Sequence, residues 1–110
     1  MPLYITRGNY TPQSISRLLA KPEDRSEAVS ALLASAGARL VQMYFTLGET
    51  DFLFIAEAPS EKEVLTALLA AAGSGAVTNV TTSQAFTTAE ASQLLDKASR
   101  VASGYRPPGG

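Results

Sequence analysis

The hydrophobic and polar positions of this 110-residue chain change period several times, and the order of the periods predicts its elements. Alternation with a period of two indicates a strand, whereas apolar residues three and four apart indicate a helix. The predicted order is strand, helix, strand, strand, helix, strand, with a further helix at the C-terminus. The strands are expected over residues 3–9, 39–47, 51–58 and 77–86, and the helices over 12–36, 60–72 and 88–102.

Residues at the helix ends support these boundaries. Pro22 lies inside the first helical pattern, so we expect a kink or a restart near Lys21, because proline removes a hydrogen bond and clashes with the preceding turn. Gly37 is suited to end that helix. The N-terminal signals are Thr11 followed by Pro12, and two capping-box pairs, Ser60 with Glu63 and Thr87 with Glu90.

This order of elements predicts a ferredoxin-like α+β fold, in which two helices cover one face of a four-stranded antiparallel sheet. The other face of such a sheet should be polar if it meets water. The strand over 51–58 carries Phe52 and Phe54 on one side and Leu53 and Ile55 on the other, so one apolar side must point away from the helices. We therefore expect a second copy to cover the bare face, giving a homodimeric α/β barrel or a higher homo-oligomer.

The alternative is that the C-terminal helix covers the bare face within the same chain, although its apolar stripe of Leu94, Leu95, Ala98 and Val101 is thin. Strand alternation assigns the faces as follows. We expect Leu3, Ile5, Val41, Met43, Phe45 and Leu47 under the helices, with Tyr4, Thr6, Gly8, Leu40, Gln42, Tyr44, Thr46, Thr82 and Gln84 on the bare face.

Polar residues of the bare face define a candidate cleft for a small aromatic or carbonyl ligand. Apolar walls with a few polar groups are typical of such sites. The competing interpretation, which we favour, is that the tyrosine rings only fill a dimer interface. The candidate cleft residues are Tyr4, Thr6, Asn9, Gln42, Tyr44, Thr46 and Asp51.

Two carboxylates are candidates for proton transfer. Asp51 follows a turn, and a turn aspartate that accepts backbone N–H bonds is the favoured interpretation over an acid or base at the mouth of a cleft. Glu57 lies about 20 Å from Asp51 along an extended strand, so the two cannot form a close pair. We expect Glu57 to lie near the sheet edge or to pair with Arg7 or Arg39.

Composition removes several classes of function. The chain has no cysteine and no histidine, which excludes a disulfide, a thiolate nucleophile, a Ser-His-Asp triad and histidine-bound metal or haem. No acidic cluster has the spacing of a calcium loop, so we expect neither a cofactor nor a metal. A net charge of −1, without a basic run, argues against nucleic-acid binding. The chain shows no signal peptide and no long apolar run, so a cytoplasmic protein without a membrane segment is expected.

Several short blocks resemble GYD-domain proteins, and the resemblance spans about residues 2–100. The blocks occupy residues 4–11, 44–52, 57–59 and 85–87. The signature glycine, any residue, tyrosine, aspartate occurs here as Gly48-Glu49-Thr50-Asp51, with Thr50 in place of the tyrosine. The resemblance implies a small bacterial domain of the ferredoxin-like, dimeric α/β-barrel type without an assigned activity. We expect one GYD-like domain over 1–102. The tail over 103–110 is rich in glycine and proline, so we expect it to be flexible.

Three functions remain open at this point, and the sequence does not decide whether the protein is an enzyme. The leading one is a homo-oligomeric module for assembly or small-molecule binding. The alternative is a cofactor-independent monooxygenase or isomerase that acts on a small aromatic or lactone substrate inside the barrel, which relatives of that barrel exemplify. The third is a regulatory domain that senses a metabolite.

Overall fold

A computed structural model describes residues 1–110 of the chain. Its elements alternate as predicted, except that the first predicted helix is divided in two. In order they are β1 (Leu3–Tyr10), α1 (Pro12–Ala20), α2 (Ser26–Ser35), β2 (Arg39–Phe45), β3 (Phe52–Glu57), α3 (Glu61–Gly73), β4 (Val77–Ala85) and α4 (Thr88–Ala102).

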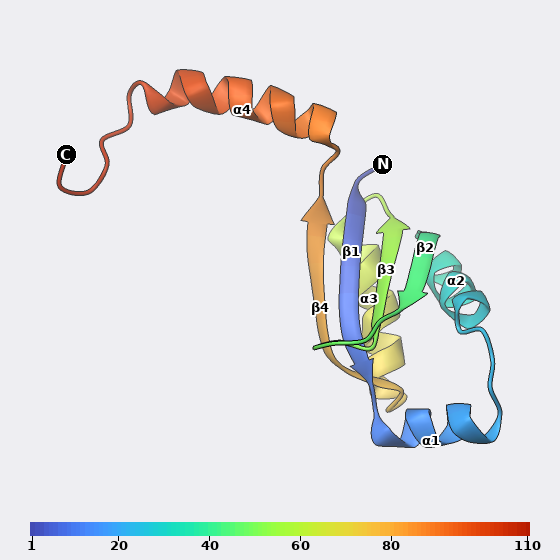
Figure 1. The fold of residues 1–110 in the computed structure, drawn as a ribbon. Helices are drawn as coiled ribbons and strands as arrows, with labels where there is room; N and C mark the ends of the chain where they lie inside the picture. Colours follow the sequence, from blue (N-terminus) through green and yellow to red (C-terminus); the bar gives the residue numbers. More distant parts are fainter.

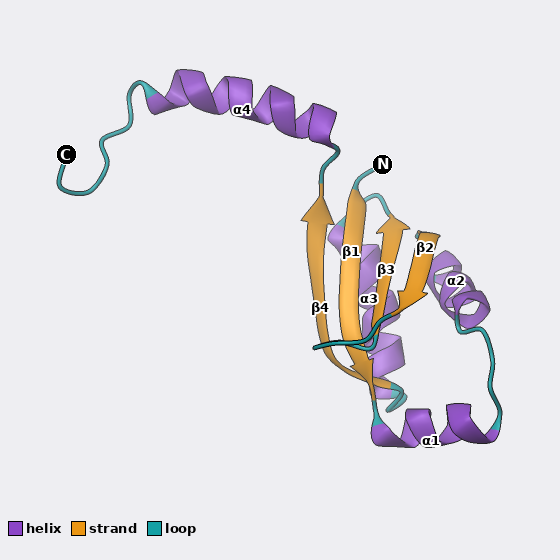
Figure 2. Ribbon diagram, in the orientation of Figure 1, coloured by secondary structure: helices purple, strands orange, loops and turns teal.

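The four strands form one antiparallel sheet in the order β2-β3-β1-β4, which is the ferredoxin-like arrangement that the sequence predicts. Helices α2 and α3 lie against one face of this sheet, behind the strands in Figure 1. No helix crosses the other face, which we call the open face (Figure 2). The fold is thus two layers with one face of the sheet uncovered.

The predicted break near Lys21 is confirmed. Helix α1 ends at Ala20, and α2 begins six residues later at Ser26. Pro22 lies in the connection, and the Asp24 carboxylate accepts hydrogen bonds there from the Ser26 backbone N–H at 2.9 Å and from the Ser26 hydroxyl at 2.7 Å. These bonds to Ser26 hold the pKa of Asp24 below its ordinary value. The two helices therefore form separately, on either side of the proline.

The hydrophobic core lies between the sheet and helices α2 and α3. Alternate residues of β3 point into it, and both helices contribute fully buried side chains. Thr6 is the buried polar residue, and its hydroxyl lies 2.9 Å from the Thr82 hydroxyl. The buried hydrophobic residues are Tyr4, Tyr10, Leu33, Ala38, Phe52, Phe54, Ala56, Ala58, Val64 and Ala67.

The predicted face of β1 is wrong. Tyr4, Thr6 and Gly8 lie under the helices, whereas Leu3 and Ile5 lie on the open face. Strand register explains the reversal, because Thr6 is opposite Phe54 and Gly8 is opposite Phe52. Cross-strand partners share a face, so the small residues of β1 lie beside the large rings of β3.

The predicted faces of β2 are correct in the half of the strand after the β-bulge and wrong in the half before it. The pairing with β3 shifts by one residue between Leu40 and Gln42, as in a β-bulge. Leu40 therefore packs against the core together with Met43, contrary to the prediction for Leu40. Val41 was expected under the helices but is exposed at the bulge.

Three further side chains do not lie where alternation places them. Leu47 is fully exposed in the loop after β2, where strand alternation no longer applies. Thr82 and Gln84 belong to the helix side of the sheet, because their partners across β1 are Thr6 and Tyr4.

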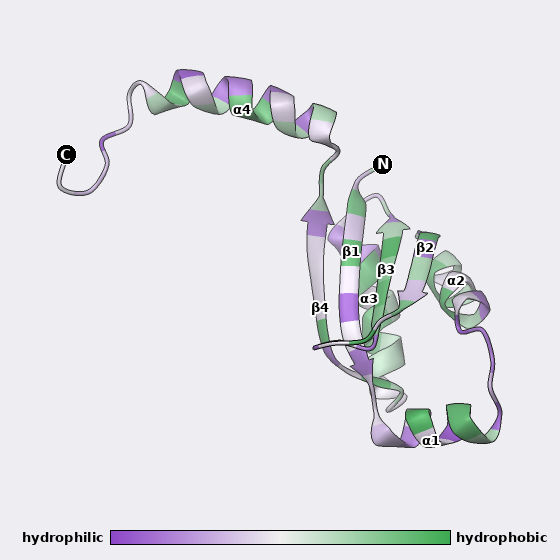
Figure 3. Cartoon of the chain, in the orientation of Figure 1, coloured by the Kyte–Doolittle hydropathy of each residue, from purple (hydrophilic) through white to green (hydrophobic).

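Helix α4 projects from the end of β4 and makes almost no contact with the rest of the chain (Figure 1). The radius of gyration is 17.8 Å, whereas a compact domain of this length has about 13 Å. Leu94, Leu95 and Val101 of its apolar stripe are exposed. Helix α4 therefore does not cover the open face within its own chain. Figure 3 shows the alternation of hydrophobic and hydrophilic segments along it.

Candidate functional site

The open face is the candidate functional site, and strand register arranges its side chains in three rows. The middle row holds Ile5 of β1 beside Ile55 of β3. One outer row holds Leu3 beside Glu57, and the other holds Arg7 beside Leu53. Leu3, Ile5, Leu53 and Ile55 are each only partly buried, so they form an apolar centre that water can reach.

Polar side chains surround this apolar centre on the two edge strands. The polar Thr81 and Ser83 of β4, together with the small apolar Ala85, continue the rows on one side. Gln42 and Tyr44 of β2 pair with Ile55 and Leu53 on the other side, and Tyr44 is 54% exposed. The face thus has the arrangement of an interface, with apolar residues in the middle and polar residues at the rim.

The charged residues of the face differ in their partners. The Arg39 guanidinium contacts Oε1 of Glu57 at 2.5 Å, so Arg39 is the partner of the two that the sequence suggested. Arg7 lies on the central strand β1 and takes part in none of the three ion pairs of the chain. The open face therefore carries one exposed cation without a counter-charge.

The loop between β2 and β3 borders the open face at one end (Figure 1). Asp51 fixes this loop, since its Oδ2 accepts from the Tyr10 backbone N–H at 3.0 Å and its own N–H donates to the Gly8 carbonyl at 2.8 Å. The Thr46 hydroxyl donates to the Thr50 carbonyl at 2.7 Å. Asp51 thus holds the loop against β1, in the backbone-binding role that we favoured for it, while the Thr46 hydroxyl bonds within the loop.

Asn9 connects the same end of the sheet to β4. Its side-chain oxygen accepts from the Asn79 amide at 2.9 Å, and its amide donates to the Glu49 carbonyl at 3.3 Å. Asn79 adopts a positive φ of 54°, a conformation that asparagine tolerates better than most residues, where the pairing of β1 with β4 shifts. Asn9, like Asp51, is engaged with neighbouring residues.

The predicted cleft residues do not converge on one cavity. Asn9, Gln42, Tyr44, Thr46 and Asp51 lie on or beside the open face, but Tyr4 and Thr6 lie beneath the helices. Tyr4 instead lines a groove of about 380 Å³ beside α3, with Leu65, Leu68, Thr82 and Gln84. Burial raises the pKa of the Tyr4 phenol, and the nearby carboxylates of Glu61 and Glu63 raise it further.

A small apolar cavity of about 60 Å³ lies between helices α2 and α3 and the sheet, and sequence reasoning did not find it. Its lining is hydrophobic except for Arg25, and it includes Tyr10, whose phenol pKa is raised by burial. An engineered cavity that binds benzene has about 150 Å³, so this one is too small for an aromatic ring. No signal in one sequence could reveal it, because it forms where residues from six elements meet.

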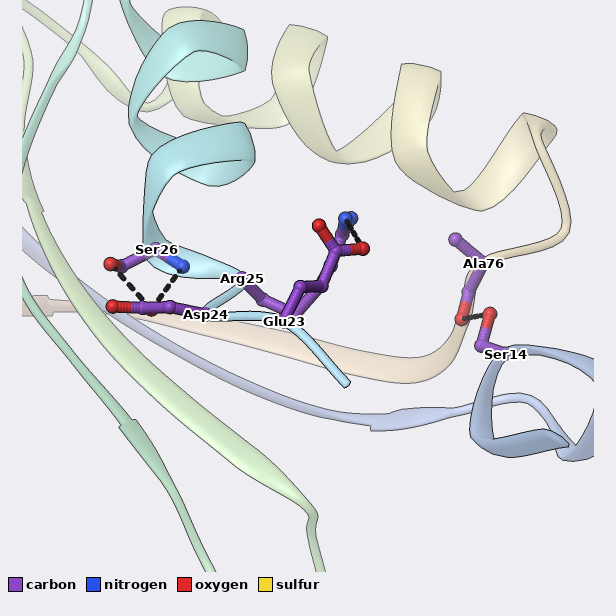
Figure 4. A network of polar contacts seen from close by, with 6 residues as sticks. All are labelled: Ser14, Glu23, Asp24, Arg25, Ser26 and Ala76. Carbon is purple, nitrogen blue, oxygen red and sulfur yellow. Dashed lines mark hydrogen bonds and ion pairs between the residues drawn. The ribbon is translucent and has the colours of Figure 1, made fainter. Parts of the chain in front are cut away.

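Arg25 and Ala76, which line this cavity, each take part in a polar contact at or near the connection between α1 and α2 (Figure 4). Arg25 forms an ion pair with Glu23 at 3.2 Å, and the Ser14 hydroxyl donates to the Ala76 carbonyl at 2.8 Å. These contacts join neighbouring segments of the fold. The structure contains no group of three or more side chains suited to hold a metal ion, and none of its helices is both long and apolar enough to traverse a bilayer.

The chain matches one known protein family over most of its length. The family model of the GYD domain matches residues 4–95. The chain belongs to the GYD domain family. The resemblance inferred from the short blocks is thereby confirmed, including across the Gly48–Asp51 stretch that lacks the tyrosine.

Two similar proteins come from Thermus thermophilus. One is named glutamine synthetase and cystathionine beta-lyase binding protein, and it is 32% identical over 81 residues, which cover 74% of this chain and 85% of the relative. The other is the crystal structure of TTHA0845, at 15% identity and a TM-score of 0.45, covering 79% of this chain and 95% of that one.

Proposed function

We propose that this GYD protein is an assembly module that associates with a second copy through its open face and binds protein partners. One observation carries the proposal: the apolar centre of the open face is covered by no element of its own chain. Burying apolar surface contributes about 25 cal/mol per Å², so Leu3, Ile5, Leu53 and Ile55 favour association. A net charge of −1 opposes this association little.

The name of the Thermus relative supports the second half of the proposal. That protein is described as binding two enzymes, glutamine synthetase and cystathionine beta-lyase. Binding to another protein needs an accessible surface and no catalytic residues. This chain offers two such surfaces, the open face and the exposed stripe of α4.

The enzymatic alternative has less support. It requires polar groups that surround a substrate, yet the candidate residues are divided between the two faces of the sheet. The apolar cavity between helices α2 and α3 and the sheet is smaller than an aromatic ring needs.

The oligomeric state tests the proposal directly. We expect wild type to be a dimer by light scattering in the micromolar range, and Leu53→Asp to be a monomer that keeps its fold. Leu69→Asp is the matched control, because Leu69 is exposed on α3, away from the open face. A monomeric wild type, or a Leu53→Asp variant as dimeric as the control, would show that the open face does not self-associate.

Partner binding has a separate test. Purified glutamine synthetase and cystathionine beta-lyase are immobilised in turn, and binding of the wild-type protein is measured by interferometry. We expect saturable binding to at least one enzyme. Failure to bind either would remove the partner-binding half of the proposal and leave the self-association half in place.

A further inference from the structure

We infer that two reciprocal salt bridges, each joining Arg7 of one copy to Glu57 of the other, set the orientation of the two open faces. This inference rests on the proposed self-association and specifies its geometry. It starts from the unpaired cation on the central strand. Covering Arg7 with a second sheet removes its guanidinium from water, which is costly unless a counter-charge accompanies it.

Glu57 is the carboxylate that can supply this charge. Among the strand residues that point to the open face, it is the sole acidic one. Arg39 donates to Oε1 of Glu57, and Oε2 of Glu57 accepts no hydrogen bond within the chain. The side chain of Glu57 is 28% exposed, so it remains accessible to a second copy.

Strand register places these two residues symmetrically about the apolar centre. Arg7 lies on β1 two residues beyond Ile5, and Glu57 lies on β3 two residues beyond Ile55 in the opposite direction. The diagonal between them spans four residues along the strands, about 13 Å, and one strand spacing of about 4.8 Å. A two-fold axis between the sheets and perpendicular to this diagonal superposes Arg7 of each copy on Glu57 of the other.

The same axis gives an ordinary sheet packing. The strands of the two copies then cross at roughly 40°, which is twice the angle between diagonal and strand and lies near the approximately 30° of aligned stacked sheets. The line from Ile5 to Ile55 runs within about 20° of this axis, so each isoleucine faces its own counterpart in the second copy, at the centre of both faces. Stacked sheets lie about 10 Å apart, a gap that the long arginine and glutamate side chains span from opposite sides.

The open face is small, so pairing of its charges should have a large effect on dimer affinity. Four strands about 4.8 Å apart, with eight residues of about 3.3 Å each in β1, give a face of roughly 19 by 26 Å. Two such faces together present about 1,000 Å², which is at the lower limit for a specific protein interface. An interface this small is sensitive to an uncompensated buried charge, so reversing Arg7 should have a large effect.

Charge reversal with rescue in a mixture is the test. Arg7→Glu and Glu57→Arg each place like charges opposite each other in a homodimer, and we expect each to raise the dimer dissociation constant at least about tenfold. Mixing the two variants brings unlike charges together again, so the mixture should form a heterodimer more tightly than either variant forms a homodimer. Sedimentation velocity measures all three samples, and thermal unfolding shows that each variant is folded.

Arg100→Glu is the matched control, since it makes the same charge change on α4, away from the open face. It should dimerise like wild type. If Glu57→Arg does not fold beside Arg39, Glu57→Gln replaces it and should weaken the dimer and its dependence on salt. An Arg7→Glu variant that dimerises normally, or a mixture that stays monomeric, overturns the salt-bridge inference while the wild-type dimer keeps the proposed function. A monomeric wild type overturns the proposed function itself.

Discussion

The two faces of strand β3 have almost the same hydrophobicity but different surroundings. Phe52 and Phe54 lie beneath α2 and α3 and are 3% exposed each, whereas Leu53 and Ile55 alternate with them on the open face and are only partly buried. The difference shows that apolar composition does not identify the core. The folded chain buries one face of β3 under its own helices, and the other face remains accessible to a second molecule.

The largest expected effect is a difference in unfolding free energy between variants of the covered face and of the open face. Phe54→Ala removes a ring from the covered face and should cost about 3–5 kcal/mol of unfolding free energy, because a cavity remains among packed neighbours. Ile55→Ala, one residue later, should cost far less in the monomer. Urea unfolding of each variant measures the difference. Equal losses would mean that Ile55 belongs to the folding core of the single chain.

A smaller effect is expected where β1 and β3 meet on the covered face. A Cβ added at Gly8 would lie 2.6 Å from Cζ of Phe52 and 3.1 Å from Cγ2 of Val80. Gly8→Ala should therefore destabilise the protein by about 1–3 kcal/mol through overpacking. Gly73→Ala is the control, since nothing lies within 4 Å of its added Cβ. Thermal unfolding should show a loss for the first variant alone.

Removing the capping box of α3 should cause the next largest loss of stability. The Ser60 side chain accepts from Lys62 N–H and donates to Glu63, and Ser60→Ala should cost about 1 kcal/mol. Thr87→Ala removes the equivalent cap of α4, which packs against nothing, so global unfolding should not change. Urea titrations compare the two. A shift of similar size in both variants would show that α4 unfolds together with the domain.

The smallest effect concerns pH. The Ser60 hydroxyl holds the pKa of Glu63 below its ordinary value. This contribution to stability is present above the unfolded pKa of about 4.3 and is lost as the pH falls through the lower folded pKa. Ser60→Ala should therefore weaken the decline in stability below about pH 4.3. An unchanged acid dependence in this variant would show that the hydroxyl does not set the pKa.

Much of the fold could be predicted because its signals are local. Thr11 with Pro12, the break at Pro22 and both capping boxes occur in the structure where the sequence places them. Each depends on residues within one helical turn. The order of elements then leaves few topologies, and the ferredoxin-like arrangement is one of them.

The candidate site was predicted less well because it depends on register. One shifted residue after Leu40 reverses the face of every side chain before it, and the pairing of Gly8 with Phe52 reverses β1. The face of α3 is also left open by spacing alone: Val64, Ala67 and Leu68 pack inward, while Leu65 and Leu69, which helical spacing also permits, are exposed. Spacing restricts the possible faces but does not choose among them.

The sequence alone determined that one face of a β-sheet would be apolar beyond the needs of two helices, since β3 has large apolar residues at both alternating sets of positions. Only the tertiary structure decided that this face carries Leu3, Ile5, Leu53, Ile55 and the unpaired Arg7, and that α4 does not cover it. The physical reason is that periodicity is a property of one segment. Which side it buries depends on the size of the side chains that lie opposite it in neighbouring strands.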